Sequence, residues 1–348
     1  MSPRKEISAN LDLLRAVAVL SVFVSHFFRA HGDLSWSSLG RFGVILFFVH
    51  TSFVLMASLE RLEKTARSKL SLALAFWIRR IFRIYPLAIL CVVSMALFRI
   101  PINPEQTYYW IGLKGFLANL ALIQNLTYSP DIQGPLWSLP VEVQIYLILP
   151  FAYFAVRGNK HYRSLALWIL AAAAALAAVY FAHIPAGPWV PQRLNIFLYA
   201  PCFTSGIVAF DLIRSRRSSW KLPAWVWLAG ISAAIVLFGP HDNLSLPAKL
   251  FRAWGLSLML GVLYANVRES RPNWTQNIFH WIAEHSYGIY LSHSAVFWVV
   301  YYRMAQTPFW AQSAVLAAAA AGIPALLYVA IEKPLIRAGS RLAGRLLA

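Results

Sequence analysis

The chain has 348 residues, of which 59% are hydrophobic and 13% charged, and its mean hydropathy is +0.58. This composition excludes an ordinary soluble domain and indicates a polytopic membrane protein. The net charge of +18 raises the question of nucleic-acid binding, and the two cysteines provide no disulfide framework.

Ten hydrophobic windows are long enough to cross a bilayer, and they predict ten transmembrane helices. They lie at residues 10–28, 42–59, 84–99, 142–156, 164–183, 196–213, 223–239, 249–266, 287–304 and 312–331. The stretch from Tyr108 to Leu126 is interrupted by polar side chains, so we expect an interfacial or re-entrant helix near 108–126. The fold class is therefore an all-α polytopic membrane protein. We expect one integral-membrane domain over residues 1–348, without a cleaved signal peptide and without an additional soluble domain.

The basic residues are distributed unevenly between the two sides of these ten spans. If the amino terminus is cytoplasmic, 22 of the 31 basic residues lie in cytoplasmic segments and Arg15 lies in the membrane. The eight on the opposite side are Arg29, Arg41, Arg99, Lys114, Arg193, Lys249, Arg252 and Arg303. This positive-inside asymmetry predicts that both termini are cytoplasmic and that the protein resides in the inner membrane. It also explains the basicity without a nucleic-acid partner.

Three polar side chains share one face of the first window. Arg15 and His26 are 11 positions apart, which returns them to within about 20° of each other at about 100° per residue. Asp12 precedes Arg15 by three positions and joins the same face. Ionisable groups inside a membrane helix are costly and mark functional sites, although a polar seam that joins helices is the simpler alternative.

Three arginines, Arg79, Arg80 and Arg83, precede the hydrophobic part of the third window. Guanidinium groups bind phosphate oxygens in a bidentate manner, so this cluster fits a cytoplasmic ligand that contains a nucleotide. Contacts with anionic lipid headgroups are the alternative interpretation.

Further polar residues flank the fourth and ninth windows. Pro140 is expected to open a helix and to place Glu142 in its first turn, at the same membrane depth as His26. Trp137 and Ser138 come just before this helix. In the ninth window, Tyr290 and His293 share a face, and a histidine there serves either chemistry or helix packing. We find neither a nucleotide-binding glycine motif nor zinc-type histidine spacing, so no metal is expected.

Six short motifs and His26 occur in an order that resembles membrane acyltransferase family 3, the integral-membrane O-acetyltransferases of bacterial surface glycans and some secondary metabolites. They are Leu11–Val19 with His26, Gly43–Phe48, Arg79–Pro86, Leu136–Glu142, Ser286–His293 and Ile331–Pro334. The resemblance extends over nearly the whole chain.

The resemblance implies an O-acyltransferase that moves an acyl group, usually acetyl, from cytoplasmic acyl-CoA to a hydroxyl of a glycan such as an exopolysaccharide or lipopolysaccharide. It implies catalytic roles for His26, Arg15 and Glu142 and cofactor binding by Arg79, Arg80 and Arg83. Where the family usually has a Ser-Gly-Phe element, this chain has His50, Thr51, Ser52 and Phe53. His50 and Ser52 are therefore candidate acceptor-site residues, together with Asp12, Trp137, Ser138, Tyr290 and His293.

Two other function classes fit polar residues on inward faces. One is an exporter of a glycan precursor or small metabolite, which changes location without covalent change. The other is a non-catalytic membrane scaffold, which the clustered titratable groups disfavour.

Overall fold

The structure is a computed structural model that describes residues 8–158, 162–181, 194–215, 220–238, 244–270 and 273–347. Seven basic residues used in the topology prediction lie outside these ranges, namely Arg4, Lys5, Lys160, Arg193, Arg216, Arg217 and Arg271. Within the described ranges the chain is helical and contains no strand, apart from an isolated bridge between Leu222 and Val267.

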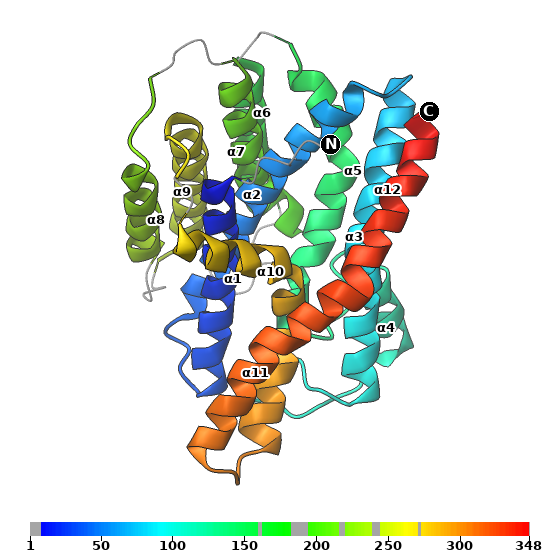
Figure 1. The fold of residues 1–348 in the computed structure, drawn as a ribbon, viewed down its shortest axis with the longest axis vertical. Helices are drawn as coiled ribbons and strands as arrows, with labels where there is room; N and C mark the ends of the chain where they lie inside the picture. Colours follow the sequence, from blue (N-terminus) through cyan, green and yellow to red (C-terminus); the bar gives the residue numbers. More distant parts are fainter. Residues whose placement is uncertain are drawn as a thin grey trace.

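The α-helices pack into one elongated bundle (Figure 1). They are α1 (Ala9–Ala30), α2 (Ser37–Glu63), α3 (Lys69–Leu97), α4 (Gly112–Leu120), α5 (Ser138–Val156), α6 (Tyr162–Phe181), α7 (Asn195–Ser215), α8 (Trp225–Phe238), α9 (Leu246–Asn266), α10 (Trp274–Trp298), α11 (Phe309–Leu327) and α12 (Lys333–Leu347). A 3₁₀ turn, η1 (Gly134–Trp137), precedes α5, and two π-helical segments, η3 (Val299–Arg303) and η4 (Tyr328–Glu332), follow α10 and α11.

Seven helical segments in the described ranges are long and apolar enough to cross a membrane. They are α1, α2, α3, η1 with α5, α6, α7, and the continuous segment from α11 to α12. Each of the ten predicted windows overlaps a helix, but α8 has 14 residues, or about 21 Å, against a hydrocarbon core of about 30 Å. The multi-pass helical class is confirmed, whereas ten spans and a cytoplasmic amino terminus stay predictions. The nine-residue α4 lies inside the predicted 108–126 segment and is too short to cross.

Helix α3 begins 15 residues before the window that predicted it. Ser68 caps it, because its hydroxyl accepts the Ser71 N–H while the Ser71 side chain accepts the Ser68 N–H. The hydropathy pattern missed this start because three arginines lower the average, although arginine is a good helix former. Arg79, Arg80 and Arg83 therefore lie in the middle of α3, not at its beginning.

Helix α5 also begins earlier than predicted. It starts at Ser138, directly after η1, so Pro140 is its third residue and Glu142 its fifth. Proline is tolerated there because the first N–H groups of a helix have no partner within the helix. Glu142 therefore lies beyond the first turn, where the helix dipole stabilises a carboxylate less than it would within the first turn.

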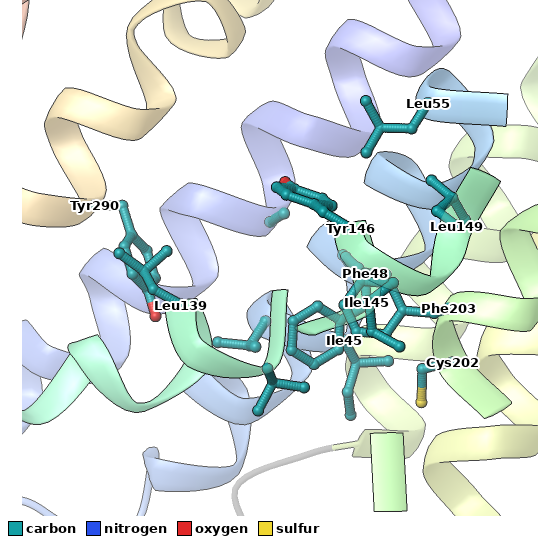
Figure 2. Packing of buried hydrophobic residues seen from close by; sticks show 14 of the residues in the cluster. Ile45, Phe48, Leu55, Leu139, Ile145, Tyr146, Leu149, Cys202, Phe203 and Tyr290 are labelled. Carbon is teal, nitrogen blue, oxygen red and sulfur yellow. The ribbon is translucent and has the colours of Figure 1, made fainter. Parts of the chain in front are cut away.

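The core joins helices that are distant in sequence. Phe48 of α2 stacks on Phe203 of α7 with ring centroids 4.2 Å apart, and Figure 2 shows both beside Ile45 and Ile145. Gly43 allows α2 to approach α1, because a Cβ atom there would lie 2.4 Å from the carbonyl oxygen of Ala18. Small residues at such contacts are typical of membrane helices, where close packing provides the association energy. This contact holds α1 in the bundle, between α2 and α10.

The last helices form a continuous segment that crosses the bundle and then runs along α3 (Figure 1). The π-helical segment η4 interrupts it just before Pro334, which has no N–H for the regular ladder. Such π-bulges often occur at functional sites because they redirect a side chain. Here the segment ends at Glu332, whose side chain is buried inside the bundle.

Candidate functional site

Arg15 lies at the centre of a group of buried ionisable residues inside the bundle. Its Nε donates a hydrogen bond of 2.7 Å to Ser286 Oγ of α10, and Ser286 in turn donates to the Ala283 carbonyl oxygen. The charges that act on Arg15 belong to Arg83 of α3, Glu332 of η4 and Glu142 of α5. Four helical elements, α1, α3, α5 and η4, therefore bring their charged groups to one place, and α10 contributes the hydroxyl of Ser286.

We call this group the arginine cluster and define it as Arg15, Arg80, Arg83, Glu142, Tyr146 and Glu332. Arg83 Nη1 lies 2.8 Å from Glu332 Oε2, and the Arg83 guanidinium lies over the Tyr287 ring at 5.9 Å. Tyr146 donates a short hydrogen bond to Glu142. Three arginines face two carboxylates, so the cluster carries an excess of positive charge.

The arginine cluster has hydrogen-bonding capacity that the described residues do not use. Arg80 Nε is buried and has no hydrogen-bond partner among them, and the Arg80 guanidinium lies 6.0 Å from the Phe76 ring. Buried charged groups without partners are costly, so such a donor calls for a ligand. An anionic ligand would satisfy both the donor and the excess charge.

Arg79 differs from its two neighbours. Its Nε is also buried without a hydrogen-bond partner among the described residues, but the charge that acts most on it belongs to Arg61 at the end of α2. Arg80 and Arg83 interact with Glu142 from α3, whereas Arg79 is not among the charges that act on Glu142. Of the three predicted arginines, Arg80 and Arg83 therefore belong to the arginine cluster, whereas Arg79 lies nearer the end of α2.

His26 lies about 16 Å along α1 from Arg15, at 1.5 Å per residue. Its ring neighbour is His293 of α10, with centroids 5.0 Å apart and the planes at 61°. His293 Nδ1 is 3.2 Å from the Ile289 carbonyl oxygen, which only accepts, so Nδ1 carries the hydrogen and Nε2 presents a lone pair. That Nε2 and His26 Nδ1 are both buried, and neither has a hydrogen-bond partner in the described ranges. Each of these two histidines therefore has a ring nitrogen that can exchange a proton with a ligand.

A cavity of about 790 Å³ opens beside His26, and we call it the histidine cavity. Its wall includes His26 of α1, Trp137 of η1, Tyr199 of α7 and Tyr290 of α10. The rings of Trp137 and Tyr199 are 5.3 Å apart. A concave site with aromatic walls and a few polar groups is typical of a small-molecule binding pocket.

Two of the candidate supporting residues hold this wall in place. Ser138 Oγ and Tyr290 Oη are 2.8 Å apart, and Tyr290 donates to the Pro135 carbonyl oxygen at 2.6 Å. These bonds fix the start of α5 to α10, beside the histidine pair. Tyr290 and His293 have ring centroids 6.1 Å apart, which agrees with their predicted common face.

The remaining candidates lie elsewhere. Asp12 Oδ2 is 2.7 Å from His280 Nδ1 of α10, so these two side chains form a separate contact. His50 is buried on α2 within the electrostatic influence of Arg15. Ser52 donates to the Phe48 and Val49 carbonyl oxygens and packs against Gly206 of α7. Ser52 therefore has a packing position and does not line the histidine cavity.

Glu142 is not where its predicted depth placed it. We expected it beside His26, yet its charged neighbours are Arg15, Arg80 and Arg83, and His26 is influenced by His293 and Arg29. The reason is the earlier start of α5, which carries Glu142 more than one turn into the helix. The structure thus separates one expected site into two, joined by α1.

Several members of these two groups were not predicted from the sequence. Tyr146 follows Glu142 by four positions, a spacing that already places the two on one helix face. Glu332 belongs to the motif Ile331–Pro334, for which the sequence predicted no role. Ser286 and Tyr287 belong to the motif Ser286–His293, but within it only Tyr290 and His293 were predicted as site residues. No group of three or more histidine, cysteine, aspartate or glutamate side chains that could hold a metal occurs in the described ranges.

Comparisons with known proteins show the family to which the chain belongs. The profile of the family described as "Acyltransferase domain" matches residues 8–331. The peptidoglycan O-acetyltransferase OatA of Listeria monocytogenes is 26% identical over 82% of this chain and 48% of its own length. The acyltransferase MdmB of Streptomyces mycarofaciens is 28% identical over 85% of this chain and 80% of its own length.

Nodulation protein 10 of Rhizobium leguminosarum is 26% identical over 85% of this chain and 86% of its own length. The chain thus spans about half the length of the Listeria relative and most of the other two. No solved structure matches the chain. Because the family profile covers all but the ends of the sequence, the chain belongs to this family of acyltransferases.

Proposed function

We propose that this protein moves an acyl group, preferentially acetyl, from cytoplasmic acyl-CoA to a hydroxyl of a glycan on the other side of the inner membrane. The observation that carries the proposal is the pair of sites on α1. Arg15 lies in the arginine cluster and His26 at the wall of the histidine cavity, about 16 Å further along the same helix. A donor held at one site and an acceptor at the other would meet along this helix.

The arginine cluster fits the donor end. Coenzyme A carries several phosphate groups and does not cross lipid, so its nucleotide must stay near the cytoplasmic side while its pantetheine arm reaches inward. The unsatisfied Nε atoms of Arg79 and Arg80 match phosphate oxygens in charge and geometry. In this proposal Arg79, Arg80 and Arg83 bind the donor, and Arg15 seats the arm that leads toward His26.

His26 is suited to be the general base. It takes the proton from the acceptor hydroxyl as that oxygen attacks the thioester carbonyl, and the carbon–sulfur bond then breaks. The imidazolium returns the proton to the departing thiolate of coenzyme A, so atoms and charges balance. The ring of His293 lies against that of His26, and its Nε2 lone pair would orient His26 or share its proton. An acyl group carried transiently by His26 is the covalent version of the same route.

Glu142 then acts as a positioning residue. It accepts a hydrogen bond from Tyr146, and together with Glu332 it partly balances three positive charges in a buried site. The export alternative uses the same cavity, but the family assignment favours chemistry over transport. The two functions differ in product, because only an acyltransferase leaves an ester.

The test is replacement of His26 by alanine in the full-length protein. Membranes that contain the wild type should transfer label from acetyl-CoA to a base-labile ester on envelope glycan, and His26→Ala should lose about 10²-fold or more of this activity. The matched control is His280→Gln, which changes a histidine on the bundle surface that pairs with Asp12. Undiminished transfer by His26→Ala at normal protein abundance would refute the role of His26.

A further inference from the structure

His50 is a buried histidine of α2 whose ring nitrogens have no hydrogen-bond partner in the described ranges. The residue is 6% exposed, and every interaction that it makes with described residues is electrostatic. His26 Nδ1 and His293 Nε2 are fully covered by other atoms, whereas the ring nitrogens of His50 keep some accessible surface. A buried imidazole without partners is costly, because its donor and its acceptor are both taken out of water. His50 therefore calls for a ligand rather than a packing role.

The packing of α1 against α2 places His50 beside Arg15. Gly40 of α2 lies against α1, because a Cβ atom there would lie 2.7 Å from Ser25 Oγ. The contact of Gly43 described above lies further along α2 and nearer the start of α1, so the two helices run antiparallel. His50 is ten positions beyond Gly40, and Arg15 is ten positions before Ser25. This register brings His50 and Arg15 to one level of the bundle, and the charge of Arg15 does act on His50.

His50 also continues the face of α2 that leads away from the histidine cavity. Gly40 and Val44 line that cavity, and the Phe47 ring lies 5.9 Å from the ring of Tyr290, which lines it too. Steps of three or four positions place these α2 residues and His50 on one side of the helix. His50 is not part of the cavity wall. It therefore lies beyond the cavity, toward the arginine cluster, along the route proposed for the donor.

We propose that His50 is a donor-site residue that forms a hydrogen bond with an amide of the pantetheine arm of acyl-CoA, opposite Arg15. This inference rests on the proposed function and adds a residue to its donor site, whereas the sequence predicted His50 at the acceptor site. The pantetheine arm contains two amides, each with an N–H donor and a carbonyl acceptor. An imidazole offers one group of each kind. The arm has no phosphate beyond the nucleotide, so its amides are the groups that a residue at this level can recognise.

Equilibrium dialysis of the purified full-length protein in non-ionic detergent tests this contact. The probes are radiolabelled coenzyme A and adenosine 3′,5′-bisphosphate, which has the nucleoside and phosphates but lacks the arm. His50→Leu should weaken binding of coenzyme A about tenfold and change binding of the bisphosphate less than about twofold. His50→Gln retains a donor and an acceptor, so it should recover part of the loss. Equal affinity of the wild type and His50→Leu for coenzyme A would overturn the proposal.

Two further variants separate a contact with the arm from general damage to the site. Thr51→Val changes the next residue of α2, which has no role in the proposed site, and it should bind both probes as the wild type does. Arg80→Gln should weaken binding of both probes, because both contain phosphate. If His50→Leu loses affinity for both probes equally, its effect is on the shape of the whole site, and the proposal is wrong. Unchanged thermal unfolding would show that each variant is folded.

Steady-state acetyl transfer distinguishes the donor site from the other sites. We expect His50→Leu to raise the KM for acetyl-CoA about tenfold, with less than about twofold change in kcat. A raised KM for the glycan, with an unchanged KM for acetyl-CoA, would return His50 to the acceptor site and overturn the inference. Binding of coenzyme A that depends on His50, without any transfer by the wild type, would defeat the proposed function alone. No binding of coenzyme A by the wild type would defeat both.

Discussion

Arg83 of α3 and Glu332 of the π-helical segment η4 form a buried ion pair with 2.8 Å between Nη1 and Oε2. The Glu332 side chain is 1% exposed and that of Arg83 is 19% exposed. The ion pair connects η4, which precedes α12, to α3, which contains the arginine motif. It also links the stability of the bundle to the charge balance of the proposed donor site.

Removing one member of this pair should destabilise the protein strongly. Glu332→Gln leaves Arg83 buried without its counter-charge, and the expected cost is about 3–5 kcal/mol. Thermal unfolding in detergent and protein abundance in membranes measure this effect. The double variant Arg83→Met with Glu332→Leu should recover most of the stability but not donor binding. A single Glu332→Gln variant as stable as the wild type would contradict the ion pair.

Arg80→Lys should weaken binding of the acyl donor more than it slows the transfer step. The lysine keeps the charge but loses the fork of donors, so we expect the KM for acetyl-CoA to rise about tenfold with a smaller change in kcat. Steady-state transfer at varied acetyl-CoA provides both constants. The control is Arg337→Lys on the exposed side of α12. If kcat falls while KM is unchanged, Arg80 acts in the reaction step and not in donor binding.

His293→Phe should lower kcat about 10²-fold and change the pH profile of transfer. Phenylalanine retains a ring against His26 but removes the Nε2 lone pair that a positioning or proton-sharing role needs. A residue that only fills space would leave the shape of the pH profile unchanged. His293→Gln retains polar atoms and should recover part of the rate. The measurement is kcat over a pH series, with circular dichroism to confirm folding.

Gly206→Ala should disturb the contact between α2 and α7. The added Cβ would lie 2.1 Å from Ser52 Oγ and 2.3 Å from the Val49 carbonyl oxygen, so the helices must separate, at a cost of about 1–3 kcal/mol. Ser52→Gly should relieve part of this cost, because it removes the side chain but not the backbone contact. Thermal unfolding of the two single variants and the double variant tests the coupling. Strictly additive effects would show that Ser52 and Gly206 are not in contact.

Ser52, at the departure from the family element at Val49–Phe53, lies against a glycine of the neighbouring helix. A Cβ atom on Gly206 would lie 2.1 Å from Ser52 Oγ, so the two helices are in close contact at this position. Ser52 therefore preserves a tight contact between α2 and α7. His50 lies near the middle of α2, where it is buried within the electrostatic influence of Arg15, and its effect on acceptor choice stays a prediction.

The sequence alone determined the class of fold, the polar face of α1 and the arginine motif, since hydropathy and helical periodicity are local properties of the chain. The common face of Arg15 and His26 follows from the 3.6-residue repeat. Membership of the acyltransferase family was also predictable, because its short motifs occur in order along the chain. The starts of α3 and α5 were not, since arginines obscured one and a 3₁₀ turn preceded the other.

Only the tertiary structure decided which polar groups meet. It placed Glu142 with Arg15, Arg80 and Arg83, paired His26 with His293, and turned Asp12 toward His280. It also gathered Arg41, Lys249 and Arg252 around one cavity from helices that are far apart in sequence. A helix pattern specifies the face on which a side chain lies, but the packing of other helices specifies its neighbour. The lining of the histidine cavity is therefore a property of the assembled bundle, because no single helix contains it.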